Sequence, residues 1–287
     1  MMKTCDLHCH SVFSDGTCTP EELLAQAEEK GLGALALTDH NTSKGLRSFI
    51  AAGENSPVTA VPGCEFSTDF KETELHIVGL FFPRTTWYDI ESYVDHMHEL
   101  KRRSNVLLIE RLRKNGYDIT CEEVAASTSA DMFNRANVAA VLKRKGYVES
   151  IKEAFQTILS ERAGLYVPAK HLDSLGTIRF IRDCGAVPVL AHPFLNLDEA
   201  GLREFLPLAK EAGLLAMETH YSTFDEPTTQ KAIELAEQFG LLQSGGSDYH
   251  GANKPDISLG TGRGSLSVPY EYFEALRESA SHLRSVI

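Results

Sequence analysis

The segment DLHCHSVFSDG, residues 6–16, begins at the end of the first strand expected in the chain, residues 3–7. His8 and His10 are two positions apart, so an extended backbone carries both imidazoles on the same side. Asp15 follows in a tight turn between a serine and a glycine. Histidines and acids just beyond a strand predict an active site there, because α/β sheets and barrels build their sites at the C-terminal ends of strands.

Strands and helices alternate outward from this segment. Residues 19–22, TPEE, supply a cap, a proline and two acids, which together start a helix, and Gly31 is placed to end it. The same patterns predict a helix at residues 43–52 and strands at residues 33–38, 57–66 and 74–82. Alternation at this pitch indicates βαβ units and an α/β fold with a parallel sheet or barrel.

The pattern changes after Pro83, where one long charged helix is expected at residues 87–115. Further helical patterns follow without clear strands between them. The alternation then returns, with strands expected at residues 186–191, 214–219 and 241–245. We therefore predict a barrel domain of residues 1–99 and 167–287 that carries a small helical insertion domain, residues 100–166.

The composition narrows the function. A net charge of -12 argues against binding to duplex nucleic acid or to an anionic membrane, which requires a basic surface. A small anionic substrate stays compatible, because bound metal ions can dominate the local field. No apolar stretch spans a bilayer and the N-terminus lacks a signal-peptide core, so we expect a cytoplasmic protein. Six scattered cysteines predict neither a disulfide framework nor a structural zinc site.

Nine ligating side chains fall at or near the ends of the expected strands. They are His8, His10, Asp15, His40, Glu65, His76, His192, Asp248 and His250. A single histidine in such a place is usually structural, but the whole set at consecutive strand ends indicates a metal centre. Imidazole and carboxylate ligands suit Zn, Mn or Fe, and nine groups exceed the needs of one ion and suit two or three.

These motifs closely resemble those of the PHP (polymerase and histidinol phosphatase) family. The matching segments are residues 6–16, TDHN at 38–41, GCEFS at 63–67, HP at 192–193 and GSDYH at 246–250. They keep the family's order from about residue 4 to residue 251. The resemblance implies a distorted (β/α)7 barrel that holds three metal ions and hydrolyses phosphate esters by attack of metal-bound hydroxide on phosphorus.

The resemblance also implies how the ligands are shared. The first ion would be held by His8, His10, Glu65 and Asp248. Glu65 would bridge to a second ion bound by His76 and His192, and the third would take Asp15, His40 and His250.

Within the family, the helical insertion resembles the subgroup that acts on nucleoside 3',5'-bisphosphates and short 5'-phosphorylated oligonucleotides, or opens a cyclic sugar phosphate. Asn134-Arg135 in the insertion and ETHYS at residues 218–222 are the local matches. They imply that Arg135 contacts phosphate and that Asn134 and Ser222 bind substrate. An unperturbed imidazole pKa near neutrality makes His220 a candidate to donate a proton to the leaving group. The alternatives are a surface salt bridge for Arg135 and a packed or solvent-facing imidazole for His220.

The expected function is therefore metal-dependent hydrolysis of phosphate monoesters in nucleotides or at oligonucleotide ends. The alternatives are a phosphatase or cyclic phosphodiesterase of a small sugar phosphate, a histidinol phosphate phosphatase, and a non-catalytic, metal-stabilised module. The expected partner is a small phosphorylated substrate, either a nucleotide or a short oligonucleotide. The sequence leaves protein partners and the choice among the three metals open.

Overall fold

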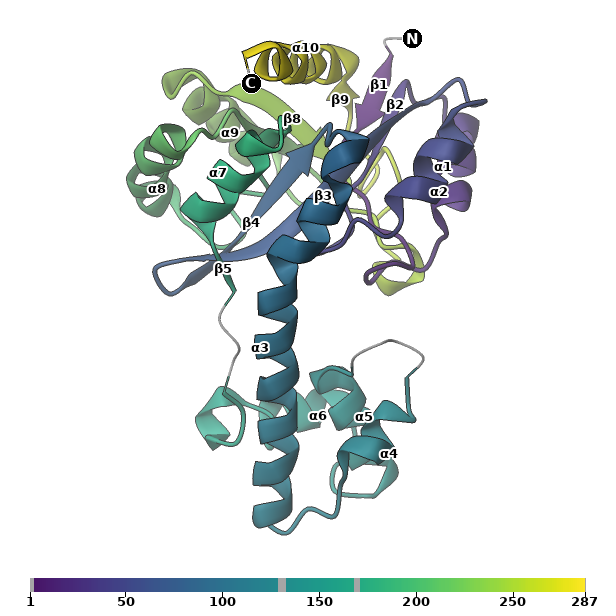
Figure 1. Cartoon of the computed structure of the whole chain (residues 1–287), viewed down its shortest axis with the longest axis vertical. Coiled ribbons are helices and arrows are strands. Elements are labelled where there is room, and N and C mark those ends of the chain that lie inside the picture. Colours follow the sequence, from purple (N-terminus) through teal and green to yellow (C-terminus); the bar gives the residue numbers. More distant parts are fainter. Residues whose placement is uncertain (1–2, 129–132, 168–170, 287) are drawn as a thin grey trace. The chain divides into compact units, whose positions relative to one another are not determined.

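The computed structural model describes residues 3–128, 133–167 and 171–286. The chain forms two compact units, one made of Met1–Val94 with His171–Ile287 and the other of Asp95–Lys170. Their limits differ by about five residues from those expected from the sequence. Helix α3, Trp87–Lys114, runs unbroken from one unit into the other, so no helix end marks the boundary (Figure 1).

The larger unit is built on a sheet that nearly closes into a barrel, as the sequence predicted. Its strands are β1 Thr4–Asp6, β2 Ala34–Leu37, β3 Thr59–Phe70, β4 Thr73–Leu80, β5 Leu172–Asp173, β6 Val187–Leu190, β7 Ala216–Tyr221, β8 Leu242–Gly246 and β9 Val268–Pro269. The order is β8-β7-β6-β4-β3-β2-β1-β9, with β5 beside β3. Hydrogen bonds from Leu7 N to Gly245 O (3.1 Å) and from Asp248 N to His8 O (2.8 Å) join β8 and the residues after it to the segment that follows β1.

Strand β4 breaks the parallel pattern that the sequence predicted, since it runs antiparallel to both β3 and β6. The reason is the connection between β3 and β4, which is only two residues long. A parallel neighbour needs a crossover of a dozen residues or more. The reversal places the start of β4 at the end of β3, where His76 pairs with Ser67.

Helices cover the outside of the sheet and one end of the barrel (Figure 1). They are α1 Pro20–Glu29, α2 Leu46–Gly53, α7 Ser174–Asp183, α8 Glu199–Ala212, α9 Glu226–Gln238 and α10 Tyr270–Val286, with short helices η1 Arg84–Thr86 and η3 Gly251–Asn253. Helix α1 begins with the predicted cap: Thr19 and Glu22 hydrogen-bond reciprocally, which satisfies two free backbone N–H groups. None of the helices in the described residues is both long and apolar enough to cross a membrane.

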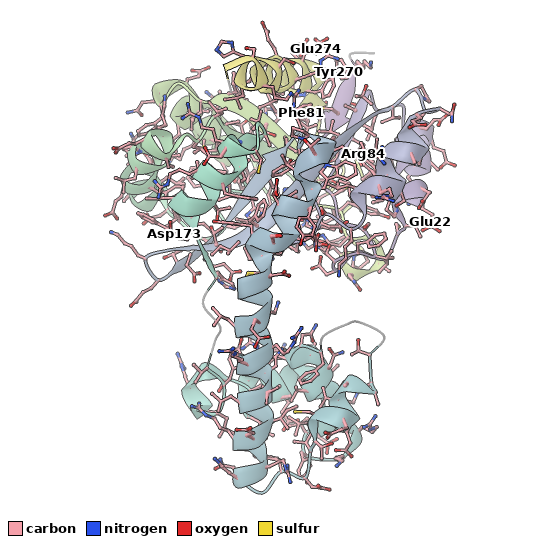
Figure 2. All side chains as sticks on the ribbon, viewed as in Figure 1. Glu22, Phe81, Arg84, Asp173, Tyr270 and Glu274 are labelled. Carbon is pink, nitrogen blue, oxygen red and sulfur yellow. The ribbon has the colours of Figure 1, made fainter. Side chains whose placement is uncertain are left out.

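Helix α10 packs onto the end of the barrel where the parallel strands begin. Its Phe273 and Leu276 are buried in the same apolar cluster as Cys5 of β1 and Ala34 of β2. Phe81 lies beneath this helix (Figure 2), with its ring centroid 5.9 Å from that of Phe273. This half of the barrel is apolar, so the polar chemistry is confined to the opposite mouth.

The smaller unit is entirely helical in the residues that the structure describes. It contains the C-terminal part of α3 with α4 Cys121–Ala125, α5 Arg135–Arg144, α6 Ile151–Gln156 and η2 Glu161–Ala163. Leu108 and Leu112 of α3 pack with Val138 and Leu142 of α5 in a core of its own.

Candidate metal centre

The site lies at the barrel mouth, where β1 and β8 approach each other closely. His10 N donates to Tyr249 O at 2.9 Å, which continues the pairing of the two strands beyond their ends. At Gly246 of β8, a Cβ atom would lie 2.4 Å from the Cβ of His8. Only glycine fits there, and this close approach brings the motif at residues 246–250 against the motif at residues 6–16.

Two buried acids hold the loops that carry the ligands. Asp6 accepts hydrogen bonds from the backbone N of Ser247 (2.8 Å) and of Gly260 (2.7 Å). Asp39 accepts from the backbone N of Ser11 (2.8 Å) and from the hydroxyl of Ser14 (2.6 Å). Asp39 therefore serves to fix the loop between His10 and Asp15.

His192 and Asp248 turn into the mouth through left-handed backbone conformations, with φ of 28° and 55°. Residues with a Cβ rarely adopt such values, which cost roughly 1–3 kcal/mol and cluster at functional sites. Each residue follows its strand closely, so the left-handed turn aims the side chain inward at the point where the strand ends.

The first group of side chains surrounds one oxygen of Glu65. His8 Nε2 lies 3.1 Å and His10 Nε2 lies 3.2 Å from Glu65 Oε2, and Asp248 Oδ1 lies 3.2 Å from the same nitrogen of His10. These four residues come from β3 and from the segments that follow β1 and β8, and all are buried. Their ligating atoms lie within 4.8 Å of one another.

A second group shares the same carboxylate. His76 Nδ1 and His192 Nε2 lie 2.7 and 3.0 Å from Glu65 Oε1. His40 Nδ1 lies 3.2 Å from Glu65 Oε2. His40, Glu65 and His76 form a compact ligand set, so His40 borders this group as well as the third.

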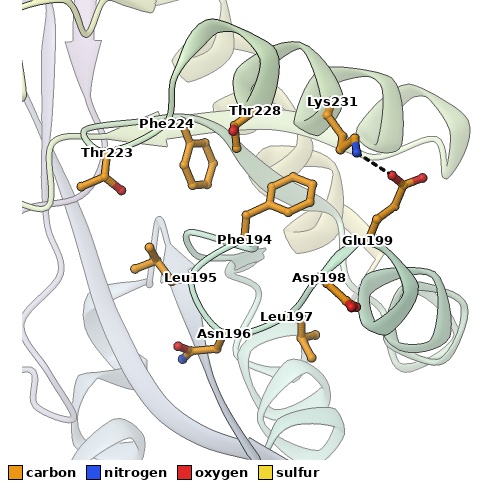
Figure 3. Close-up of a pocket in the computed structure, with 10 residues that line it drawn as sticks. All are labelled: Phe194, Leu195, Asn196, Leu197, Asp198, Glu199, Thr223, Phe224, Thr228 and Lys231. Atoms are coloured by element: carbon orange, nitrogen blue, oxygen red, sulfur yellow. Dashed lines mark ion pairs between the residues drawn. The ribbon is translucent and has the colours of Figure 1, made fainter.

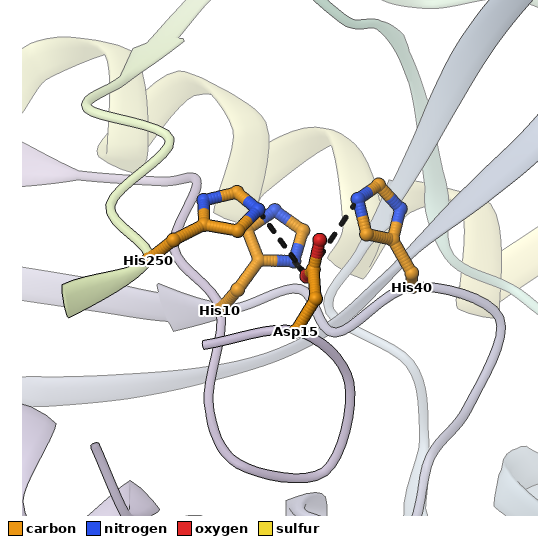
Figure 4. A group of neighbouring side chains, drawn as sticks. All are labelled: His10, Asp15, His40 and His250. Carbon is orange, nitrogen blue, oxygen red and sulfur yellow. Dashed lines mark ion pairs between the residues drawn. The ribbon is translucent and has the colours of Figure 1, made fainter. Parts of the chain in front are cut away.

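The third group gathers around Asp15, which is the most exposed of the nine residues (Figure 4). His250 Nε2 lies 3.2 Å from Asp15 Oδ1, and His10 and His40 follow at 3.7 and 3.9 Å. The structure thus brings all nine expected ligands together in three overlapping groups.

The geometry of the cluster suits bound divalent cations better than hydrogen bonds among its own side chains. Among the described residues, five buried side-chain atoms lack a hydrogen-bond partner: His8 Nε2, His10 Nδ1, His10 Nε2, His40 Nδ1 and Glu65 Oε2. Three of these nitrogens lie 3.1–3.2 Å from Glu65 Oε2 but outside hydrogen-bond geometry. Buried polar atoms are nearly always satisfied, so atoms that converge without bonding are the arrangement expected of metal ligands.

Comparison with known proteins identifies the family. A family model described as PHP domain matches residues 6–178, more than half of the chain. The chain belongs to the PHP domain family. It is 30% identical over 251 residues to a 5'-3' exoribonuclease of Haemophilus influenzae, covering 87% of this chain and 91% of that protein.

Two further similarities extend across nearly the whole PHP chain. A phosphoribosyl 1,2-cyclic phosphate 1,2-diphosphodiesterase of Eggerthella lenta is 29% identical over 86% of this chain and 94% of its own. A solved structure from Bifidobacterium adolescentis, assigned as a metal-dependent phosphoesterase, matches with a TM-score of 0.77 and 26% identity over 96% of both chains. The chain is therefore a metal-dependent phosphoesterase, a hydrolase of phosphoric ester bonds.

Charge within the PHP site is balanced between the carboxylates and the imidazoles. Burial lowers the pKa of His10, but Asp248 and Glu65 outweigh it and raise this pKa to about 9. In the same way, Glu65 overcomes burial and raises the pKa of His76 to about 10. Burial dominates at His40, whose pKa falls to about 3. The neighbouring imidazoles hold the pKa of Glu65 well below its usual value despite the burial that opposes it.

Three residues of the PHP site were not predicted as part of it. Glu218 Oε1 lies 2.8 Å from His8 Nδ1, and its other oxygen accepts from the backbone N of His192 at 2.7 Å. Tyr221 donates to Asp248 Oδ2 at 2.6 Å, and Lys254 Nζ lies 2.7 Å from the same oxygen. Glu218 and Tyr221 belong to the motif at residues 218–222, but the function of that motif was assigned to His220 and Ser222.

His220 contacts residues other than the metal ligands. Its ring packs edge-on against Tyr272 with centroids 5.5 Å apart, and its Nδ1 lies 3.0 Å from the Thr219 hydroxyl. Ser222 donates its hydroxyl to Ser247 O at 2.6 Å. The contacts of His220 are those of a packed imidazole, which was its alternative. The hydrogen bond of Ser222 links the segment after β7 to the segment after β8.

Asn134 and Arg135 belong to the helical unit, where both have local roles. The amide oxygen of Asn134 caps α5 by accepting from the backbone N of Ala136 and Asn137. The Arg135 guanidinium lies over the ring of Tyr166, 4.0 Å from its centroid. Arg135 therefore makes a cation–π contact, and no salt bridge of its guanidinium is found among the residues that the structure describes.

Glu218 should fix the orientation of His8, because a carboxylate on the second ring nitrogen holds the tautomer that a metal ligand needs. We expect Glu218→Gln to weaken Mn²⁺ affinity by about 10–100-fold. Chelator competition measures this, with Glu204→Gln, a surface carboxylate paired with Lys71, as the matched control. Equal affinity in both variants would remove Glu218 from the centre.

Metal binding should release protons. At pH 7.5 the raised pKa values of His10 and His76 keep both imidazoles protonated, and a metal ion must displace those protons. Affinity for Mn²⁺ should therefore rise with pH up to about 10, the higher of the two pKa values. Titration calorimetry in buffers of different ionisation enthalpy measures the released protons, and a heat independent of the buffer would contradict the expectation.

Proposed function

We propose that this PHP chain hydrolyses phosphate esters of nucleotides or of oligonucleotide ends, with divalent ions bound by its nine clustered histidines and carboxylates. One observation supports the proposal above all. The buried Glu65 carboxylate is approached by imidazoles from four different strands or strand ends, at distances of 2.7 to 3.2 Å.

We assign the ligands as three overlapping sets. The first is His8, His10, Glu65 and Asp248; the second is Glu65, His76 and His192, with His40 beside it; the third is Asp15, His40 and His250. When bound, Mn, Zn or Fe ions would neutralise the charge of a phosphate ester and lower the pKa of coordinated water. Imidazole and carboxylate ligands accept each of these metals.

Lys254 brings a positive charge to this cluster, since its Nζ lies 2.7 Å from Asp248 Oδ2. It lines a cavity of about 200 Å³ together with His40, Glu65 and His192. Its ammonium group, held beside Asp248, can donate to a phosphate oxygen at the mouth. We therefore assign to Lys254 the phosphate contact that the sequence analysis placed on Arg135.

The nucleotide assignment is supported by similarity to the exoribonuclease of Haemophilus influenzae, which is named for action on a 5' end. The second candidate is a cyclic sugar phosphate, supported by the similarity to the Eggerthella lenta diphosphodiesterase. Both candidate substrates present a phosphate ester to the same cluster. They differ in the group attached to that phosphate, which is a nucleoside in one and a small sugar in the other.

Phosphate release by Mn-loaded enzyme from a substrate panel tests the assignment. The panel contains adenosine 3',5'-bisphosphate, short 5'-phosphorylated RNA, ribose 1,2-cyclic phosphate and histidinol phosphate. We expect the highest kcat/KM for one of the first two. A clear preference for the cyclic phosphate would replace nucleotides by the second candidate, and no release from any compound would reject the function.

Replacing Lys254 should weaken catalysis without emptying the metal sites. A charge-assisted hydrogen bond contributes about 1.5–3 kcal/mol, so Lys254→Ala should lower kcat/KM by about 10–150-fold. Metal content, measured by elemental analysis, should stay at the wild-type level. Lys71→Ala, which removes a surface lysine paired with Glu204, is the control. Unchanged kcat/KM in Lys254→Ala would exclude the phosphate contact.

A further inference from the structure

A second and larger cavity opens directly beside the metal centre. It has a volume of about 620 Å³ and lies between the loop after β6 and the segment that leads into α9 (Figure 3). Leu195 and Asn196 line both this cavity and the smaller one at the cluster. A ligand anchored at the metal centre can therefore extend into this cavity without crossing the protein interior.

Aromatic rings lead from the metal centre into this cavity. The ring of His192 lies 5.3 Å from that of Tyr221, and Tyr221 lies 5.2 Å from Phe224. Phe224 in turn lies 6.0 Å from Phe194 at an angle of 73°. Figure 3 shows both phenylalanine rings among the side chains that line the cavity, and both are only half-buried. Leu195 beside them is 49% exposed, an unusual amount for a large apolar side chain at a polar mouth.

The charged groups of the cavity are already engaged with one another. Lys231 Nζ lies 2.8 Å from Glu199 Oε2, as the dashed line in Figure 3 marks. Asp198 caps α8 by accepting from Gly201 N at 2.8 Å. The lining therefore offers no free cation for a second phosphate. It favours a flat, uncharged group with apolar faces and a polar edge.

We propose that the Phe194–Phe224 cavity binds the nucleobase of a substrate whose phosphate ester lies at the metal centre. This inference rests on the proposed function, and it makes the nucleobase the part of the substrate that the cavity recognises. Either ring can pack against a base face, and the hydroxyl groups of Thr223 and Thr228 line the same cavity for contact with the base edge. Every base has such a face, so this contact selects nucleotides over sugar phosphates without selecting one base.

The test compares adenosine 3',5'-bisphosphate with its abasic analogue, in which hydrogen replaces the base. Stacking of a base on an aromatic side chain contributes about 1–3 kcal/mol, which is about 5–150-fold in kcat/KM. We expect the wild-type enzyme to prefer the nucleotide by this factor. Phe194→Leu and Phe224→Leu, which keep apolar volume but remove the ring, should lose most of the preference, because kcat/KM should fall much more for the nucleotide than for the abasic analogue.

Phe70→Leu is the matched control, because Phe70 is a half-buried phenylalanine paired with Phe205 outside the cavity. It should leave the preference unchanged. Equal kcat/KM for the two compounds in the wild-type enzyme would overturn the inference without any variant. A preference that survives both cavity variants would also overturn it. Failure to hydrolyse either compound, together with no phosphate release from 5'-phosphorylated RNA, would instead reject the proposed function.

Discussion

A buried carboxylate surrounded by imidazoles is the constraint on which the rest of this structure depends. Glu65 is fully buried, and an ionised carboxylate in such a place costs several kcal/mol unless positive charge or hydrogen bonds compensate it. Five histidines approach its two oxygens, and they do so without enough hydrogen bonds to satisfy every atom. Divalent cations between these groups would satisfy the ligands and the charge together.

The barrel allows this convergence because its apolar core and its polar cluster occupy different ends. Helix α10 and the apolar residues beneath it fill one end, so the packed core and the polar cluster occupy opposite halves. The Asp6 network and Gly246 draw β8 against β1 at the other end. The hairpin of β3 and β4 adds His76 to a mouth that a fully parallel barrel would have built without it.

Much of this was accessible from the sequence, because ligating residues at strand ends converge in any closed α/β sheet. The antiparallel direction of β4 was not, since the apolar pattern of a strand carries no direction. Nor was the role of Tyr221. In a regular strand, alternate side chains share a face, so Glu218 and His220 would point together. A register irregularity between them shifts the alternation, so that Glu218 and Tyr221 face the cluster and His220 packs against Tyr272.

The most direct test is a crystal soaked with manganese and measured at the manganese absorption edge. The account predicts anomalous scattering between His8, Glu65 and Asp248 and within the two neighbouring ligand groups that share Glu65 and His40. Absence of anomalous signal at the mouth, with the His8 and His192 side chains turned away from Glu65, would contradict it.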